Sequence, residues 1–431
     1  MFPRGINSVN SGLRALALGA SLLASSAALA DAVTDWGVFA DSLALGGPPQ
    51  RARTTAIMYV AMHDALNSIQ PHYESYAHVP RARRGASPDA AVGEAAYLAL
   101  KGAAPVALGA SIDAFYNTWY LVSSGCPNAG CADGVTAGEL AANAILALRT
   151  GDGSATPHLT YTLPPGPGIY EKTPVTPPSP PNPPAPVDPQ FAGWAHVTPF
   201  VLTSGSQFRA PPSLLFNLKS WLYTRDYNEV KRVGDVDSET EGGRTPDQSE
   251  IARFWPGGGA NINAVGRVIA QGRNLDLWQH ARLFALINLA NSDANVTVFD
   301  TKYTYNFWRP VTAIRAGATD GNPFTVADAT WLSYQNTPPY PDYTCGLTNA
   351  TGSGLAVLRS YFGTDRIAYS LTTPGGIARS FESLSQAGFE SVDARVFGGM
   401  HFRTGCLLGL IQGGQVGRYV FEHSLRPRGK H

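Results

Sequence analysis

The sequence is short of charged residues, and this shortage excludes several classes of partner. Charged residues make up 15% of the 431 positions, and 32 basic residues balance 32 acidic ones. A balanced chain has no electrostatic basis for binding nucleic acid or an anionic membrane surface. Hydrophobic residues make up 44%, with 45 Gly and 33 Pro. We therefore expect a loop-rich globular protein with a core large enough for one or two domains.

Long apolar runs are also missing beyond the N-terminal region, so we expect no membrane span in the mature protein. Arg4 and Arg14 precede the run "ALALGASLLASSAALA", and the Ala-Leu-Ala triplet at 28–30 fits a signal-peptidase site. A membrane anchor is the alternative, but this run is short and rich in Ala and Ser. We expect residues 1–30 to be a cleaved signal peptide of a secreted or periplasmic bacterial protein.

Cysteine is scarce, and an exported protein tends to pair its cysteines. The four are Cys126, Cys131, Cys345 and Cys406. The first two lie in "CPNAGC", where a Pro/Gly turn can close a local disulfide, and this leaves Cys345 to pair with Cys406. A metal site is the other interpretation, but no His accompanies "CPNAGC" at zinc-finger spacing.

Most of the remaining sequence has the apolar periodicity of helices. One segment, 163–189, is too rich in Pro for a helix or a central strand and is expected to run extended over the surface. We predict an all-α protein with an N-terminal helical bundle over 31–162, a linker over 163–200 and a C-terminal bundle over 201–431. The expected helices cover 50–69, 89–103, 134–153, 213–234, 262–308 with a break near Gly272, 350–362 and 404–422.

Two segments of the second half place charged residues in apolar surroundings, and a turn at Gly346 lies between them. Lys302 and Arg309 are seven residues apart in "KYTYNFWRP", which is two helical turns and predicts one face. Arg395 and His401 flank glycines in "ARVFGGMH", where a backbone can approach a ligand closely. Gly346 lies between these segments and offers a backbone N–H. Burying three cations costs several kcal/mol each unless an anion neutralises them.

The neutralising anion has two interpretations from the residues alone. It is either a bound oxyanion or a set of carboxylates in an ion-pair network. In the network, Lys302 would pair with Asp300, and Arg395 would pair with Asp393 or Glu390.

The same motifs resemble those of the bacterial vanadium-dependent haloperoxidase-like proteins, in the superfamily shared with type 2 phosphatidic acid phosphatases and bacterial acid phosphatases. Lys302, Arg309 and Pro310 match Lys-x6-Arg-Pro, and Arg395 and His401 match the end of Ser-Arg-x5-His. The likeness also covers "AMHDALNSI", "SQFRAPPS", "ARLFALINLANSDA", "RPVTAIRAG" and "GGMHFRTGCLLG", so it spans nearly the whole mature chain. It implies two packed α-helical bundles with an oxyanion site in the second.

The resemblance also implies roles for these residues. Lys302, Arg309, Arg395 and the Gly346 amide would hold the oxygens of vanadate or phosphate. His401 would bond the central atom, either as the ligand of vanadate or as the nucleophile of a phosphatase. Vanadate is the implied cofactor, and the partner is a small oxyanion or a small-molecule substrate. The sequence gives no indication of oligomeric state.

The middle motif of the superfamily, Pro-Ser-Gly-His, is degenerate here. Thr344, Cys345 and Leu347 replace its Pro, Ser and His, and Gly346 alone agrees. In the family, that His is the acid/base group, and losing a positioned acid costs about 10²–10⁴ in rate. A thiol is a weaker donor than a hydroxyl, and a Cys345–Cys406 disulfide pinning the loop would donate nothing. Peroxidase or phosphatase chemistry should therefore be weakened or altered.

Three features are candidates to replace the missing acid: Asp342, Tyr343 and the His63-Asp64 pair. Each has another explanation or a weakness. Relatives commonly carry an acidic residue at 342, a tyrosine with an ordinary pKa of about 10 is a poor acid at neutral pH, and a His on an apolar helix usually serves packing. Two other functions stay open. The protein is either a non-catalytic periplasmic anion-binding or scaffold protein, or a redox-neutral, vanadium-independent enzyme acting on an organic substrate.

Overall fold

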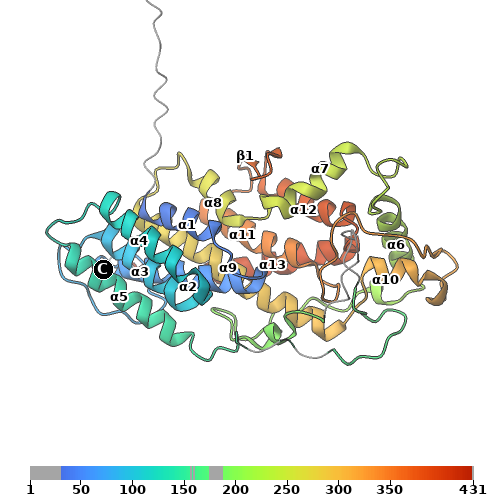
Figure 1. The fold of residues 1–431 in the computed structure, drawn as a ribbon, viewed down its shortest axis with the longest axis horizontal. Helices are drawn as coiled ribbons and strands as arrows, with labels where there is room; N and C mark the ends of the chain where they lie inside the picture. The colour runs from blue at the N-terminus through green and yellow to red at the C-terminus, as the bar shows by residue number, and fades with distance from the viewer. Residues whose placement is uncertain (1–30, 156–157, 159–160, 174–187, 430–431) are drawn as a thin grey trace, which may run out of the picture.

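The computed structural model describes residues 31–155, 158, 161–173 and 188–429, and it is built mainly from α-helices (Figure 1). Helices of the N-terminal half, in blue and cyan, gather toward one end of the long axis, and most of the later helices gather toward the other. The prediction of an all-α fold is confirmed. The helices are α1 Ala32–Ser42, α2 Pro48–Ile69, α3 Pro88–Ala103, α4 Gly109–Val122, α5 Cys131–Leu148, α6 Trp221–Val233, α7 Pro246–Phe254, α8 Ile262–Ala270, α9 Leu277–Tyr305, α10 Pro310–Arg315, α11 Gly346–Phe362, α12 Leu384–Phe397 and α13 Arg403–His423.

One short hairpin departs from the expected absence of strands. β1 (Tyr369–Thr372) pairs antiparallel with β2 (Ala378–Phe381), and Tyr369 lies opposite Phe381. Strands of four residues are too short to show a reliable alternation in sequence.

Helix α9 forms the centre of the molecule and contacts both groups of helices. It begins at a capping box in which Asp276 accepts from the Gln279 amide and the Gln279 side chain accepts from the Asp276 amide. Helix α2 packs against it from the N-terminal half, and α11 and α13 pack against it from the C-terminal half. The buried hydrophobic residues of both halves form one connected cluster. The division into domains at 162 and 201 stays a prediction.

Glycines let α11 and α13 approach at backbone distance. A Cβ at Gly413 would lie 1.9 Å from the Asn349 carbonyl oxygen, and one at Gly409 would lie 2.7 Å from the Cys345 carbonyl oxygen. A side chain at either position would push the helices apart. This packing brings the first turn of α11 next to the first turn of α13, where the site lies.

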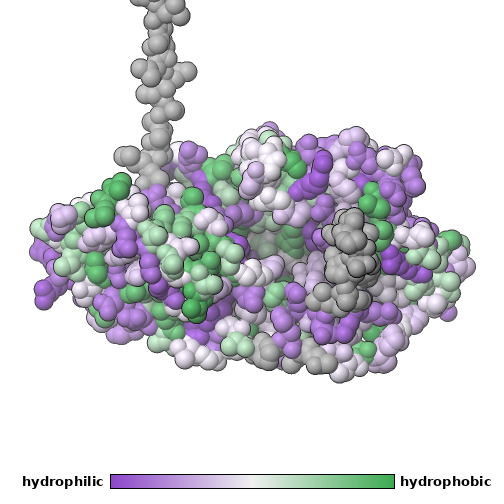
Figure 2. Space-filling model, viewed as in Figure 1, coloured by the Kyte–Doolittle hydropathy of each residue, from purple (hydrophilic) through white to green (hydrophobic). Residues whose placement is uncertain are grey.

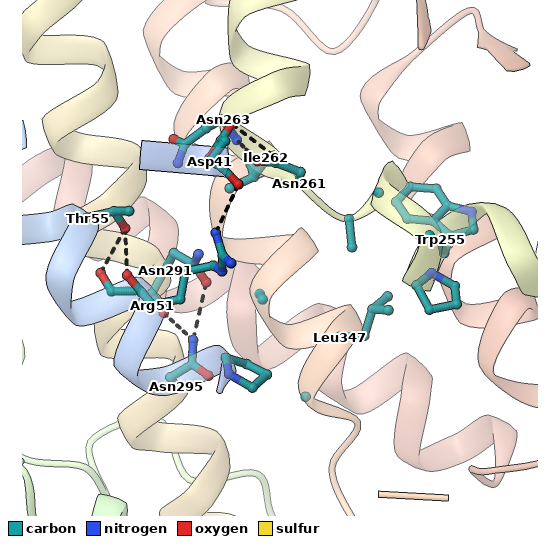
Figure 3. A pocket seen from close by; sticks show the side chains of 18 of the residues that line it. Asp41, Arg51, Thr55, Trp255, Asn261, Ile262, Asn263, Asn291, Asn295 and Leu347 are labelled. Carbon is teal, nitrogen blue, oxygen red and sulfur yellow. Dashed lines mark hydrogen bonds between the residues drawn. The ribbon is translucent and has the colours of Figure 1, made fainter. Parts of the chain in front are cut away.

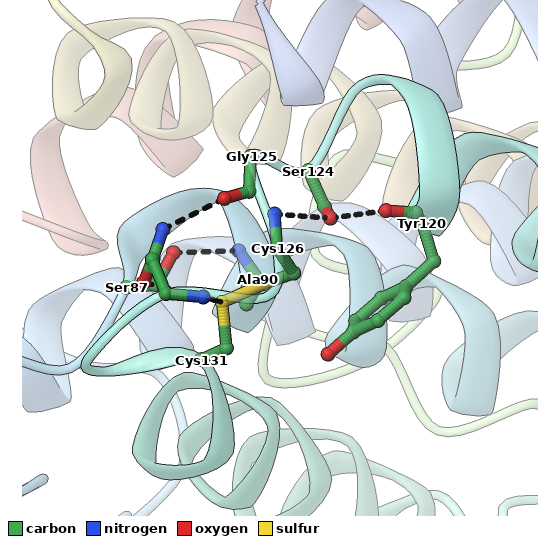
Figure 4. Close-up of a disulfide and its surroundings, with 8 residues drawn as sticks. Ser87, Ala90, Tyr120, Ser124, Gly125, Cys126 and Cys131 are labelled. Atoms are coloured by element: carbon green, nitrogen blue, oxygen red, sulfur yellow. Dashed lines mark hydrogen bonds between the residues drawn. A yellow bond between two sulfur atoms is a disulfide. The ribbon is translucent and has the colours of Figure 1, made fainter.

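The predicted Cys126–Cys131 disulfide is confirmed (Figure 4). It joins the loop after α4 to the first residue of α5. The Asn128 side chain donates to the Gly125 carbonyl across the same turn. This disulfide stabilises a local turn in the N-terminal half.

Two predicted features lie outside the described residues: the signal peptide at 1–30, and residues 174–187 of the Pro-rich segment. Within the described part of the chain, every helix is too short or too polar to cross a membrane. On the face seen in Figure 2, hydrophilic and hydrophobic residues are interspersed.

Candidate oxyanion site

The described structure brings the predicted cationic residues and His401 to one buried region. Arg309 Nη1 lies 2.9 Å from His401 Nε2, and Arg395 and His401 line the same cavity as Gly346. Lys302 and Arg309 are fully buried, while Arg395 and His401 are 7% and 1% exposed. Three separated segments of the chain therefore meet at one place.

Lys302 and Arg309 do not share one helical face as predicted. Helix α9 ends at Tyr305, and Asn306 follows in the left-handed region at φ 50°. Arg309 is then the N-cap of α10, which begins at Pro310. The two cations converge because the chain turns between them, which a helical-face argument cannot detect.

The Lys302 ammonium holds the loop that precedes α11. It donates to the carbonyls of Pro341 at 3.0 Å and Asp342 at 3.3 Å, and also to that of Thr344. An ammonium has three protons, so all of its donors are used. Burial and then the charge of Arg309 lower the pKa of Lys302 to about 7. In this structure Lys302 shapes the site and adds charge, while its protons go to the backbone.

Arg309 and Arg395 differ from Lys302 because each has a buried donor without a partner. Arg309 Nε donates to the Tyr340 carbonyl at 2.8 Å, and Nη1 donates to the Met400 carbonyl at 2.9 Å. Among the described residues, Arg309 Nη2 and Arg395 Nε have no hydrogen-bond partner. An unsatisfied buried donor on a charged group is costly, and an anion would satisfy both.

His401 is oriented by Asp342. The Nδ1 atom lies against Asp342 Oδ1, and the Phe402 amide donates to Oδ2 at 3.3 Å. Arg309 can only donate, so in the neutral imidazole Nε2 is the acceptor and Nδ1 carries the proton. Burial would raise the pKa of Asp342, but the charge and hydrogen bond of His401 hold it below its ordinary value. In this structure Nε2 therefore faces Arg309, while Nδ1 faces Asp342.

The alternative ion-pair network is wrong for the carboxylates that were named. Asp300 pairs with Arg209 at 2.6 Å. Asp393 pairs with Arg403 and Glu390 pairs with Arg379 at distances of 2.6 and 2.7 Å. Since these carboxylates have other partners, they do not neutralise Lys302 or Arg395.

The predicted Cys345–Cys406 disulfide is absent, because both cysteines are free, buried thiols. Cys345 precedes α11, and its amide donates to the Gly405 carbonyl at 3.0 Å. Burial opposes ionisation, but a hydrogen bond with Cys406 and the hydrogen bond and charge of His401 hold the pKa of Cys345 well below its usual range. Burial and the adjacent Cys345 sulfur raise the pKa of Cys406. The two sulfurs lie within 4.8 Å of one another.

None of the proposed replacement acids occupies the missing position. Asp342 is committed to His401, and the Tyr343 hydroxyl donates to the Pro211 carbonyl. His63 lies in the core between Asp64 and Asn67, at 3.0 and 3.2 Å. Among the described residues that line the cavity, His401 is the one imidazole.

The site opens into a cavity of about 550 Å³ that residues of both halves line (Figure 3). This volume is within the range of small-molecule sites. Arg51 comes from α2, Asn291 and Asn295 come from α9, and Leu347 comes from the first turn of α11. Sequence reasoning missed the first three. The signal that could have found Asn291 and Asn295 is "ANSDAN", whose polar residues interrupt an otherwise apolar helix.

Comparisons with known proteins show similarity of sequence in the half of the chain that holds the site. Residues 282–429 match the family model of the VCPO second helical-bundle domain, a range that includes all of the predicted site residues. The vanadium chloroperoxidase of Curvularia inaequalis is 27% identical over 271 residues, covering 47% of this chain. The chain is thus similar to the vanadium haloperoxidases, and in its second half it matches their helical-bundle domain. The match covers 43% of the Curvularia protein, less than half of its length.

Solved structures extend the likeness of fold to most of the chain. The first bacterial vanadium-dependent iodoperoxidase has a TM-score of 0.76 and 24% identity, covering 93% of this chain and 96% of its own. An apo-type bacterial vanadium-dependent chloroperoxidase has a TM-score of 0.71 and 18% identity, covering 89% and 95%. The predicted haloperoxidase type of helical fold is confirmed.

Proposed function

We propose that this protein binds vanadate or phosphate at Arg309, Arg395 and His401. Lys302 and the Gly346 amide complete the positive surroundings. The observation that carries this proposal is the pair of buried donors without partners, Arg309 Nη2 and Arg395 Nε. Two guanidinium groups that are already desolvated bind a tetrahedral or trigonal-bipyramidal oxyanion without further loss of hydration.

The donor set fits vanadate in charge and in kind. Lys302, Arg309 and Arg395 are buried, and the Asp342 carboxylate near Lys302 and Arg309 offsets only part of their charge, so an added anion lowers the electrostatic free energy. The arginines would hold the oxygens, and the His401 imidazole would bond the central atom. Vanadate, when bound, supplies the Lewis acidity that activates peroxide. Asp342 keeps the His401 ring in one orientation.

The chemistry of this site is weakened by Leu347. Its aliphatic side chain lines the cavity (Figure 3), and no second imidazole lies among the described lining residues. A positioned acid contributes about 10²–10⁴ to rate. We infer that halide oxidation is slow, and that phosphate esters with good leaving groups, which need little protonation, are the better substrates.

Calorimetric titration with phosphate and with vanadate tests the binding proposal. Arg395→Gln should weaken both affinities about 10–100-fold, because it removes a charged hydrogen-bond donor. Arg359→Gln is the matched control, since Arg359 lies on α11, pairs with Asp365 and does not line the cavity. An unchanged affinity in Arg395→Gln, or no binding of either anion by the wild type, would refute the proposal.

The N-terminal sequence supports a further proposal, that the protein is exported to a bacterial periplasm or medium. N-terminal sequencing of the secreted protein should begin at Asp31. Retention of the intact chain in the cytoplasm would contradict it.

A further inference from the structure

The two free cysteines form a compact group with His401. The proposed oxyanion binding does not involve their thiols. The Cys345 sulfur, the Cys406 sulfur and a His401 ring nitrogen all lie within 4.8 Å of one another. Both cysteines are fully buried. Leu347 and Val392 pack around the sulfurs. A pair of thiols in contact beside an imidazole is a reactive arrangement rather than a packing requirement.

Hydrogen bonds to the backbone hold the segments that carry the two cysteines next to each other. The Cys345 amide donates to the Gly405 carbonyl at 3.0 Å, and the Thr348 hydroxyl donates to the Cys406 carbonyl at 2.9 Å. A disulfide needs the sulfurs to close to about 2 Å. From at most 4.8 Å, side-chain rotation covers most of that movement while α11 and α13 stay in place.

The two sulfurs have unequal surroundings, which assigns them different roles. Cys345 is the N-cap of α11 and faces Arg395 and His401. Positive charge and a helix N-terminus favour a thiolate, which is the nucleophilic form of cysteine. Cys406 lies beside it in the first turn of α13. This arrangement matches an attacking thiolate with a resolving thiol next to it.

We propose that Cys345 and Cys406 are a redox-active dithiol that reduces hydrogen peroxide. The Cys345 thiolate attacks one peroxide oxygen, so an S–O bond forms and the O–O bond breaks. Sulfur is oxidised to a sulfenic acid, and the departing hydroxide takes a proton to become water. The Cys406 thiol then displaces the hydroxyl, forming the disulfide and releasing a second water. An external dithiol restores both thiols.

Because both sulfurs are buried, only a small oxidant can reach them. Neither sulfur is exposed, while the neighbouring Gly346 and His401 line the cavity. A molecule as small as hydrogen peroxide can approach by way of the cavity, and a bulky organic hydroperoxide cannot. The same three ligands would suit a soft metal ion, but Lys302, Arg309 and Arg395 oppose a divalent cation.

The test is thiol titration and peptide mapping of the full folded protein, reduced with a mild dithiol that leaves Cys126–Cys131 intact and treated with a chelator. One equivalent of hydrogen peroxide should remove both free thiols and yield a Cys345–Cys406 cross-linked peptide. Cys406→Ser should accumulate a sulfenic acid on Cys345 that a cyclic dione traps. Cys345→Ser should keep Cys406 reduced at the same dose. With dithiothreitol present, the wild type should consume peroxide faster than Cys345→Ser.

Three outcomes would overturn the proposal: persistent free thiols in the wild type, equal oxidation of Cys406 in Cys345→Ser, or zinc that remains bound and protects both thiols. Circular dichroism of each variant confirms that it is folded. Phosphate titration of the same samples keeps this result separate from oxyanion binding, since the dithiol can fail while the anion binds, and the reverse.

Discussion

Replacing Asp342 by Asn removes the carboxylate that faces the buried cations. Asp342 is fully buried, contacts His401 Nδ1 and lies near Arg309 and Lys302. Removing one partner of a buried charged pair leaves an uncompensated charge and costs about 3–5 kcal/mol. We expect Asp342→Asn to lower the free energy of unfolding by this amount at pH 7.

Urea unfolding measures this loss, and Asp300→Asn is the matched control. Asp300 pairs with Arg209, whose side chain is 37% exposed, so breaking this pair should cost about 1 kcal/mol or less. Excess phosphate should stabilise Asp342→Asn more than the wild type, because an anion replaces the lost charge. Equal losses in the two variants, or greater phosphate stabilisation of the wild type, would refute this view of the site.

The pH dependence gives the same prediction an independent check. The folded pKa of Asp342 lies below its ordinary value, because His401 outweighs the effect of burial. Asp342 therefore contributes its stabilisation fully above pH about 4, the unfolded value, and loses it as pH falls through the folded pKa. Asp342→Asn should lack this loss and unfold less steeply in acid. An identical acid profile in both proteins would contradict the assignment.

Three further results are expected. The folded pKa of Lys302 is about 7, so stability should gain a rising contribution between pH 7 and 10 that Lys302→Met lacks in urea unfolding. Gly409→Ala should lower the free energy of unfolding by about 1–3 kcal/mol and slow the oxidation of Cys345, because its Cβ would lie 2.7 Å from the Cys345 carbonyl oxygen. Gly414→Ala is the control: its Cβ meets open space, so neither stability nor oxidation should change. Leu347→His should raise aryl-phosphate hydrolysis or vanadate-dependent bromide oxidation, and no gain in either assay would contradict a lost acid.

The helical class and most helix positions could be predicted because apolar periodicity is local. The predicted helix at 50–69 corresponds to α2 at Pro48–Ile69, and the break near Gly272 separates α8 from α9. Helix α12, which carries Arg395, was missed, because its buried residues Ala387, Gly388 and Ser391 are small or polar and give little periodicity.

The site was only partly predictable because its contacts are not local. Motif order identified Lys302, Arg309, Arg395 and His401, but it could not show that the Lys302 protons go to backbone carbonyls. Nor could it show that Asp342 holds His401. Those contacts depend on how the loop after Pro338 folds against the end of α9. No pattern within the loop predicts that it lies against this helix.

Two of the three changes in the middle motif, Cys345 and Leu347, have a combined electrostatic consequence. Leu347 removes a titratable group from the site, and Cys345 introduces one that can carry negative charge next to Arg395. A thiolate there neutralises part of the charge that an oxyanion would otherwise neutralise. Anion affinity should therefore rise in any variant that keeps position 345 uncharged, and a reduced, ionised Cys345 should compete with vanadate or phosphate for the same cations. The presence of Cys instead of Ser at position 345 would thus link the redox state of the chain to the occupancy of its cationic site.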